Sequence, residues 1–311
     1  RILREDGKGS YYNYRILSKD EDNPEPSTIS FGASPADYST DVLGEKAVDI
    51  IQSTPQETPL FLIWTPNAPH DPYTSPPGAK RVNPEPIAPY SLNDKSGKPP
   101  WIANREPVTA KKSIATQKAQ IKTLQSVDIW VEKISAALKA SGKWENTVFV
   151  FASDNGYFVG QYGLLGMKNH PHPPSTHVPL MVVAPSLRNL AGSTDNRLVT
   201  LADIPATIAL EAGLDGSAMD GLALNAPQST WRTGALVTGW RNRGSDPAGN
   251  QPEYCAWRTQ GWLFIQYSAN SQGEGYRELY NLTVDANALV NLAGTVEAGS
   301  IEEELAQLTK S

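Results

Sequence analysis

The sequence predicts an α/β fold around a mainly parallel central sheet, with a small antiparallel subdomain at its C-terminal end. Three short apolar runs are nearly continuous rather than alternating, as in parallel strands that are covered on both faces. Amphipathic helical patterns separate these runs. After about residue 220 the sequence becomes aromatic and β-rich. We therefore expect an α/β core over residues 1–220 and a C-terminal subdomain of antiparallel sheet plus helix over residues 221–311.

The three apolar runs are the expected core strands. They are PLFLIW at 59–64, TVFVFA at 147–152 and VPLMVVA at 178–184. We predict that the first two are neighbours in the central parallel sheet, ending at Trp64 and Ala152. Ligands of open parallel sheets bind beyond the carboxyl ends of the strands, so the residues after these two positions become candidates for a site.

Three segments carry helical periodicity in the core. They cover residues 34–52, 113–142 and 201–214. The second has its apolar side chains three or four residues apart and closes at Gly142, a residue typical of helix C-termini. The third offers Asp203 as a helix cap.

The C-terminal part predicts strands and one helix. Two β-rich segments, 254–268 and 276–285, flank the turn-like residues 269–275. The acidic segment 300–310 predicts a helix. Residues 66–110 are rich in proline, asparagine and glycine, and such a long irregular stretch is typical of a functional loop.

Composition narrows the classes of partner. The net charge of −6 and the pI near 5.3 argue against a nucleic-acid partner, which requires a clustered basic face. No apolar run approaches the ~20 residues of a membrane span, so we expect none. The single cysteine, Cys255, excludes an internal disulfide and any multi-cysteine zinc site.

Two predicted strand ends are followed by polar side chains. His70 lies in TPNAPHDP after the first run, and Asp154 and Asn155 lie in SDNG after the second. Carboxylate and amide oxygens are the ligands that calcium or magnesium accepts, and Gly156 lets the backbone turn away. Lys168, further along, suits a tetrahedral oxyanion. Taken singly, each feature could also be an ordinary turn or a surface residue.

Several blocks of the sequence, in order, resemble the sulfatases, type I enzymes of the alkaline phosphatase superfamily. They include PLFLIWTPNAPHDP, TVFVFASDNGYFVGQYGLLGMKN, VPLMVVAPSL, LADIPATIALEAGL and RELYNLTVDANALVNLAG. The opening YYNYR and YSTDVLGEKAVDII are most similar to the N-acetylglucosamine-6-sulfatase branch, although the arylsulfatases are also alike. The resemblance covers nearly the whole chain.

The resemblance implies hydrolysis of a sulfate monoester, on a sulfated sugar or an aryl sulfate, with Ca²⁺ as cofactor. It assigns Asp154 and Asn155 to the metal and His70 and Lys168 to the sulfate. It also implies a secreted, periplasmic or lysosomal-type location. The family's nucleophile is a formylglycine made from a Cys-X-Pro-Ser-Arg motif, and Cys255 lies in EYCAWRT instead.

The chain begins RILREDGKGSYYNYR, without methionine or a signal-peptide pattern. We expect it to be the C-terminal portion of a longer sulfatase, with the nucleophile and further calcium ligands upstream. An N-terminal fragment of the same protein is then a possible partner. As it stands, we expect the 311-residue chain to be inactive and to bind calcium weakly.

The sequence departs from the family after Lys168, where HPHPPSTHVPL replaces the usual Tyr-Glu. His170 and His172 could reach a sulfated sugar or be structural, and His177 follows in the same segment. Asn281 begins an Asn-Leu-Thr glycosylation sequon within an expected strand.

Two alternatives stay open. One is a non-catalytic binding protein with a sulfatase fold. The other is a phosphodiesterase or phosphonate hydrolase of the same superfamily, although the bimetallic histidine-rich pattern of its phosphate enzymes is not evident among four histidines.

Overall fold

The computed structural model describes residues 2–6, 10–19, 25, 27–85, 92–227, 231–240, 252–268 and 275–309. The chain divides into two compact units. Unit 1 comprises residues 1–85 and 114–147, and unit 2 comprises residues 86–113 and 148–311. Unit 2 contains both sides of the domain boundary expected at residue 220, and that boundary stays a prediction.

Unit 1 contains a small sheet and two helices. The sheet has the order β1-β2-β3, with antiparallel pairing throughout. The elements are β1 (Ile2–Asp6), β2 (Arg15–Lys19), β3 (Ser27–Ser30), α1 (Ser39–Ser53) and most of α3 (Ala110–Ala140). Short 3-10 turns lie at Pro35–Asp37 and Trp144–Asn146.

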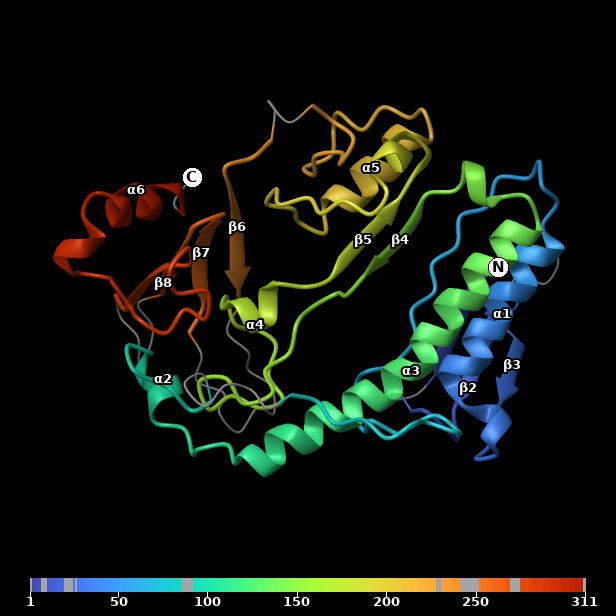
Figure 1. Ribbon diagram of the computed structural model, residues 1–311, viewed down its shortest axis with the longest axis horizontal. Coiled ribbons are helices and arrows are strands. Elements are labelled where there is room, and N and C mark those ends of the chain that lie inside the picture. The colour runs from blue at the N-terminus through green and yellow to red at the C-terminus, as the bar shows by residue number, and fades with distance from the viewer. Residues whose placement is uncertain are drawn as a thin grey trace. The chain divides into compact units, whose positions relative to one another are not determined.

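The helices α1 and α3 confirm the predicted helical segments and lie side by side (Figure 1). Asp41 of α1 accepts hydrogen bonds from Ser126 Oγ at 2.5 Å and from Trp130 Nε1 at 2.7 Å, both on α3. Gly142 ends α3 as predicted, with a φ of +69° that glycine adopts without strain. The contact between the two helices therefore includes one carboxylate acceptor on α1 and two donors on α3.

The apolar run at 59–64 does not form the predicted strand. Residues 59–64 are irregular, and Phe61 and Ile63 are 72% and 69% exposed. A strand requires a neighbour that pairs its backbone N–H and C=O groups. Residues 59–64 belong to unit 1 and residues 149–152 to unit 2, and the relative positions of the two units are not determined. The predicted pairing of strands ending at Trp64 and Ala152 therefore stays a prediction.

The other two apolar runs are strands, but their pairing is antiparallel. They are β4 (Phe149–Ala152) and β5 (Leu180–Val183), with Ala152 opposite Leu180. The connection, residues 153–179, leaves β4 and re-enters β5 at the same end instead of crossing the sheet with a long helix. All strand pairs in the described residues are antiparallel, and the expected mainly parallel pairing is not among them.

The C-terminal antiparallel sheet was predicted and is present in unit 2, with the order β6-β7-β8-β9. Tyr254 pairs with Tyr267, and Trp262 pairs with Asn281. The strands are β6 (Gly234–Gly239), β7 (Tyr254–Thr259), β8 (Trp262–Tyr267) and β9 (Arg277–Asn281).

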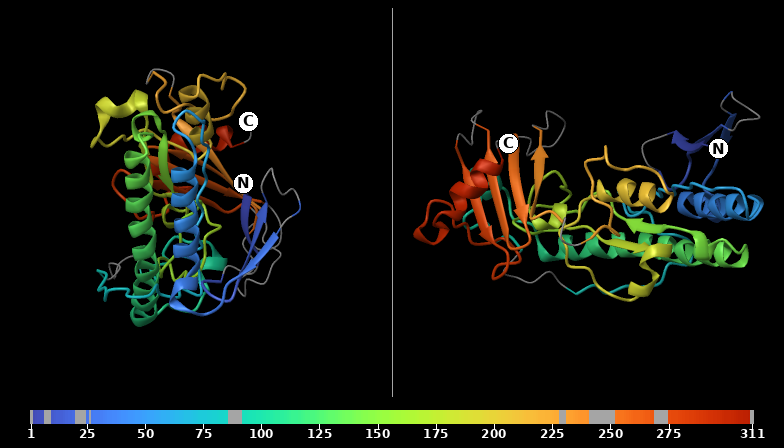
Figure 2. Two further views of the ribbon diagram at one scale, coloured as in Figure 1. Left: turned by 90° about the vertical axis from the view of Figure 1, so that its right-hand side faces the viewer. Right: turned by 90° about the horizontal axis from the view of Figure 1, so that it is seen from above.

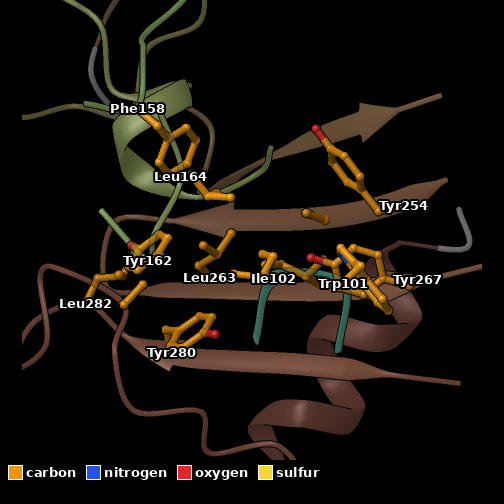
Figure 3. Packing of buried hydrophobic residues seen from close by; sticks show 13 residues of the cluster. Trp101, Ile102, Phe158, Tyr162, Leu164, Tyr254, Leu263, Tyr267, Tyr280 and Leu282 are labelled. Carbon is orange, nitrogen blue, oxygen red and sulfur yellow. The ribbon is translucent and has the colours of Figure 1, made fainter. Parts of the chain in front are cut away.

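Both faces of this sheet are covered, because alternate residues of a strand point to opposite sides. On one face Leu263 and Tyr280 pack with Trp101 and Ile102 of α2 (Pro100–Ala103) (Figure 3). On the other face Phe264 packs with residues of α6 (Ile301–Leu308), the predicted C-terminal helix. Figure 2 shows α6 beside this sheet. The other buried members of the cluster on the first face are Phe158, Tyr162, Leu164, Tyr254, Ala256, Ile265, Tyr267, Leu282 and Ala288.

Two short helices complete unit 2. They are α4 (Pro173–Thr176) and α5 (Asp203–Glu211), with 3-10 turns at Pro185–Leu190 and Val296–Ala298. Asp203 does not cap α5 as predicted. Its buried carboxylate accepts from the backbone amides of Thr200 and Leu222 and pairs with Arg232 at 2.5 Å.

None of the helices in the described ranges is sufficiently long and apolar to cross a bilayer.

Candidate functional site

The loop after β4 places two hard oxygen donors beside each other. Asp154 is exposed and Asn155 is half-buried. Ser153 Oγ donates to the Asn155 carbonyl at 2.8 Å, and Asn155 Nδ2 donates to the Gly156 carbonyl at 2.9 Å. The second bond uses the amide nitrogen of Asn155 within the loop, so a cation at this loop would have to bind the amide oxygen, Oδ1.

Gly156 is required by a close approach to α4. Its N–H donates to the Ser175 carbonyl at 2.8 Å, and the next amide, of Tyr157, donates to the Pro174 carbonyl at 2.8 Å. A Cβ at residue 156 would lie 2.2 Å from the Pro174 oxygen. No real Cβ tolerates that distance to a backbone atom, so only glycine allows these two segments to meet.

The segment that carries Lys168 is held by the same helix. Ser175 Oγ donates a short hydrogen bond to the Lys168 carbonyl. Phe158 N–H donates to the Met167 carbonyl at 2.9 Å, which closes the intervening loop. The side chain of Lys168 is half-buried. Helix α4 thus brings together the backbones of the Asp154–Asn155 loop and the Lys168 segment.

His70 belongs to unit 1, where its loop is bound to the N-terminal segment. Tyr11 Oη donates to the His70 carbonyl at 2.7 Å, and His70 N–H donates to the Asn67 carbonyl at 2.8 Å. The imidazole is 54% exposed and its Nδ1 lies 2.9 Å from Asp71 Oδ1. The positions of the two units relative to one another are not determined, so convergence of His70 with the residues of unit 2 stays a prediction.

The donor set of the Asp154–Asn155 loop fits a hard cation in part. Calcium takes ~6–8 oxygen ligands, and this loop offers one carboxylate and one amide oxygen. Among the described residues no group of three or more His, Cys, Asp or Glu side chains could hold a metal ion. The loop can therefore supply two ligands of a calcium site whose other oxygens come from elsewhere.

The side chains of His170 and His172 are buried in the interior of unit 2. They are 2% and 0% exposed, whereas His177 is exposed. His172 Nε2 lies 2.9 Å from Glu278 Oε2 on β9, and neither ring nitrogen of His170 has a hydrogen-bond partner among the described residues. Of the two roles open for these histidines, burial supports the structural one.

Glu278 is the centre of a fully buried polar cluster. Its carboxylate accepts from Tyr267 Oη at 2.6 Å and makes a short bond with Tyr280 Oη. Lys98 Nζ lies 3.7 Å from Glu278 Oε2, and both side chains are 0% exposed. Lys98 also donates to Tyr280 Oη at 2.7 Å and lies 4.2 Å above the ring of Tyr162.

The charges of this cluster follow from its contacts. Burial disfavours the Glu278 carboxylate, but the hydrogen bonds from His172 and Tyr267 and the charge of Lys98 outweigh it and lower its pKa to about 2. Burial lowers the pKa of Lys98 to about 8, and Glu278 opposes that shift. Burial also lowers the pKa of His172. At neutral pH, neutral His172 therefore donates to an ionised Glu278 that is paired with Lys98⁺.

The sequence did not single out three of these residues. They are Lys98 and Glu278 of the buried cluster and Ser175 of α4. Lys98 follows a glycine in an irregular loop, and Ser175 lies among prolines, so neither carries a local signal. Glu278 carries one, because it is a lone acid in RELYNL, a strand otherwise rich in buried Leu and Tyr. An acid at such a position must find a partner.

Comparisons with known proteins show which family the chain belongs to. The family model "Sulfatase" matches residues 5–214. Human N-acetylglucosamine-6-sulfatase is 29% identical over 92% of this chain, and the chain spans 57% of that relative's length.

Two solved structures share the fold. A protein in complex with its substrate D-glucosamine-2-N,6-O-disulfate has a TM-score of 0.73 and 16% identity, over 96% of this chain and 72% of its own. The phosphonate monoester hydrolase of Agrobacterium radiobacter has a TM-score of 0.73 and 19% identity, over 89% of this chain and 61% of its own. The α/β fold is therefore alkaline phosphatase-like, and the chain belongs to the sulfatase family.

Proposed function

We propose that the chain is part of a hydrolase of sulfate monoesters that acts on a sulfated sugar. The observation that carries this proposal is the shared attachment of the Asp154–Asn155 loop and the Lys168 segment to α4, in a chain of the sulfatase family. Sugar sulfates are favoured over aryl sulfates because the human relative is named an N-acetylglucosamine-6-sulfatase. The fold neighbour in complex with a sulfated glucosamine is consistent with this preference.

The proposed roles follow from the chemistry of the side chains. Lys168 and His70 donate hydrogen bonds to non-bridging oxygens of the sulfate and offset the charge that develops as the S–O ester bond breaks. Asp154 and Asn155 supply two oxygen ligands to calcium, which when bound neutralises charge on the sulfate. The nucleophile is a formylglycine upstream of residue 1, since Cys255 lies on β7 outside any Cys-X-Pro-Ser-Arg motif.

A location outside the cytosol, whether secreted, periplasmic or lysosomal, is part of the same proposal. It is checked by microscopy or fractionation of the native protein.

The decisive experiment compares two purified chains. The first is the 311-residue chain, and the second carries the upstream formylglycine segment. Each is assayed with and without calcium on glucosamine 6-sulfate and on an aryl sulfate. We expect calcium-dependent turnover from the longer chain only. Robust turnover by the 311-residue chain alone would contradict the assigned source of the nucleophile.

Point variants of the longer chain test the individual roles. Lys168→Ala and His70→Ala should each lower kcat by about 10²–10³-fold, as the loss of an oxyanion donor does. Asp154→Asn should instead raise the calcium concentration needed for half-maximal activity. Lys111→Ala, on an exposed position of α3, is the matched control and should leave turnover unchanged.

The alternatives predict different results. A non-catalytic binding protein would bind sulfated glucosamine without turnover by either chain. The phosphonate hydrolase among the fold neighbours keeps a phosphoester alternative open. A longer chain that turned over a phosphonate monoester faster than any sulfate ester would favour that alternative.

A further inference from the structure

Helix α4 connects the candidate site to the C-terminal sheet. At one end of this connection, carbonyls of Pro174 and Ser175 accept from the amides of Tyr157 and Gly156, and Ser175 Oγ holds the Lys168 carbonyl. All these contacts use backbone or hydroxyl groups of a single turn. The orientation of that turn therefore determines the backbone positions of the Asp154–Asn155 loop and of the Lys168 segment.

A single turn cannot fix its own orientation, because it has too few internal hydrogen bonds to be stable alone. His172 is the residue that precedes α4, and its carbonyl accepts from the Ser175 and Thr176 amides at 3.0 and 3.3 Å. Its side chain is fully buried and bonded to Glu278 on β9 at 2.9 Å. The N-terminal end of α4 is thus tied to the sheet through His172.

The anchor at the other end of this bond is rigid. Glu278 is held by two tyrosine hydroxyls and by Lys98. Lys98 in turn makes a short bond with the Ala288 carbonyl. In the described part of the chain, the groups bonded or paired to this carboxylate are three hydrogen-bond donors and one cation, which together fix its orientation.

We propose that His172 and Glu278 are positioning residues, which set the geometry of the Asp154–Asn155 loop and the Lys168 segment through α4. The importance of this geometry for catalysis rests on the proposed function. Displacements of about 1 Å from reacting geometry can cost about 10²-fold in rate. The pair thus couples the C-terminal sheet to the site.

Two amide replacements of His172 give a matched test. The side-chain nitrogen of Gln reaches the position of imidazole Nε2, whereas that of Asn reaches only the position of Nδ1. His172→Gln can therefore still donate to Glu278, and His172→Asn cannot. His172→Phe keeps the ring volume and removes the donor. Asp203→Asn is the control for a buried carboxylate of unit 2 outside this connection.

The first readout is amide hydrogen exchange in the 311-residue chain, with β8 and β9 as internal reference. We expect His172→Asn and His172→Phe to speed exchange at Gly156 and Tyr157 by at least about tenfold relative to the sheet. In His172→Gln, the exchange rates of these two amides relative to the sheet should stay within about threefold of the parent values. Asp203→Asn should leave these relative rates unchanged. An unchanged ratio in both donor-less variants, or the same change in His172→Gln, would overturn the proposal.

The second readout is kinetic, in the longer chain. His172→Asn should lower kcat by at least about tenfold with little change in KM, and His172→Gln should restore it. If the parent proves inactive on every ester, the proposed function fails while the exchange result still decides the positioning role. If the parent is active and His172→Asn is equally active, only the positioning role fails. A variant that does not fold leaves the other donor-less variant to decide.

Discussion

The two loops that carry the candidate site residues are supported in different ways. In the loop at 153–179, α4 binds the backbones of residues 156, 157 and 168, and His172 ties the loop to a buried cluster around Glu278. The loop around His70 follows an irregular run with exposed Phe61 and Ile63, and its imidazole is 54% exposed.

This difference indicates which of the two loops is held in place before a ligand binds. The Asp154–Asn155 loop and the Lys168 segment are held within one compact unit by contacts that do not depend on a ligand. In the His70 loop, the carbonyls of His70 and Thr74 accept single hydrogen bonds from the hydroxyls of Tyr11 and Tyr38. Changes that disturb the first loop should therefore cost much stability, and changes at the second should cost little.

Removal of Lys98 should have the largest effect. Lys98→Met would leave the carboxylate of Glu278 buried without its cation, and breaking a buried pair typically costs about 3–5 kcal/mol. We expect a loss of this size in the free energy of unfolding, measured by urea denaturation followed by tryptophan fluorescence. Lys111→Met, at an exposed position, serves as the control. Equal stability of the two variants would show that the cluster does not stabilise unit 2.

The next largest effect is expected at Gly156. Gly156→Ala places a Cβ against the Pro174 oxygen, and forcing extra atoms into a packed site costs about 1–3 kcal/mol. The hydrogen bonds to α4 should lengthen, so the amides of residues 156 and 157 should exchange faster. Gly216→Ala is a control, because the nearest atom to its Cβ would lie 3.7 Å away. A native-like melting temperature for Gly156→Ala would contradict the close approach.

The contrast between the loops also separates what the sequence could predict from what it could not. Helix α3 was predicted because its periodicity is local. The sulfatase family was identified, and Asp154, Asn155 and Lys168 were proposed as site residues, because their motifs are contiguous. The bond between His172 and Glu278 joins residues 106 positions apart, and no local pattern encodes it.

The errors have a similar origin. An apolar run shows that a segment can be buried, but it does not name the strand beside it. Residues 59–64 therefore suggested a strand that the described structure lacks, and β4 and β5 suggested parallel neighbours. The antiparallel pairing depends on the 153–179 loop returning to its starting end, which in turn depends on Gly156 and α4.

A pH effect should distinguish the buried loop from the exposed one. Burial, with the nearby charge of Arg105, lowers the pKa of His170 to about 3. The unfolded chain then binds a proton near pH 6.5 that the folded chain excludes until about pH 3, so stability rises with pH across this window. Lowering the pH from 6.5 to 5 should cost about 2 kcal/mol through His170.

His170→Phe tests the source of that pH dependence. The replacement removes the titrating group and breaks no hydrogen bond among the described residues, so its cost at pH 7 should be small. Its urea midpoint should fall less between pH 6.5 and pH 5 than that of the parent. His70→Phe is the matched control, because His70 is exposed. Parallel pH profiles for the parent and His170→Phe would contradict the assignment.

The smallest effect is expected in the His70 loop. Tyr11→Phe removes the hydroxyl that donates to the His70 carbonyl, and a hydrogen bond of this kind contributes about 0.5–1.5 kcal/mol. The loss of stability should be confined to residues 67–73, because the ring of Tyr11 still stacks on that of Tyr38, with 5.4 Å between the ring centroids. Tyr38→Phe, which loses its own bond to the Thr74 carbonyl at 2.9 Å, offers a comparison on the same loop. Hydrogen exchange should show faster exchange at His70 in Tyr11→Phe, with the amides of α1 unchanged. A loss above about 3 kcal/mol, or one that spreads to α1, would show that the two loops do not differ in support, because such large costs are typical of buried networks rather than single bonds.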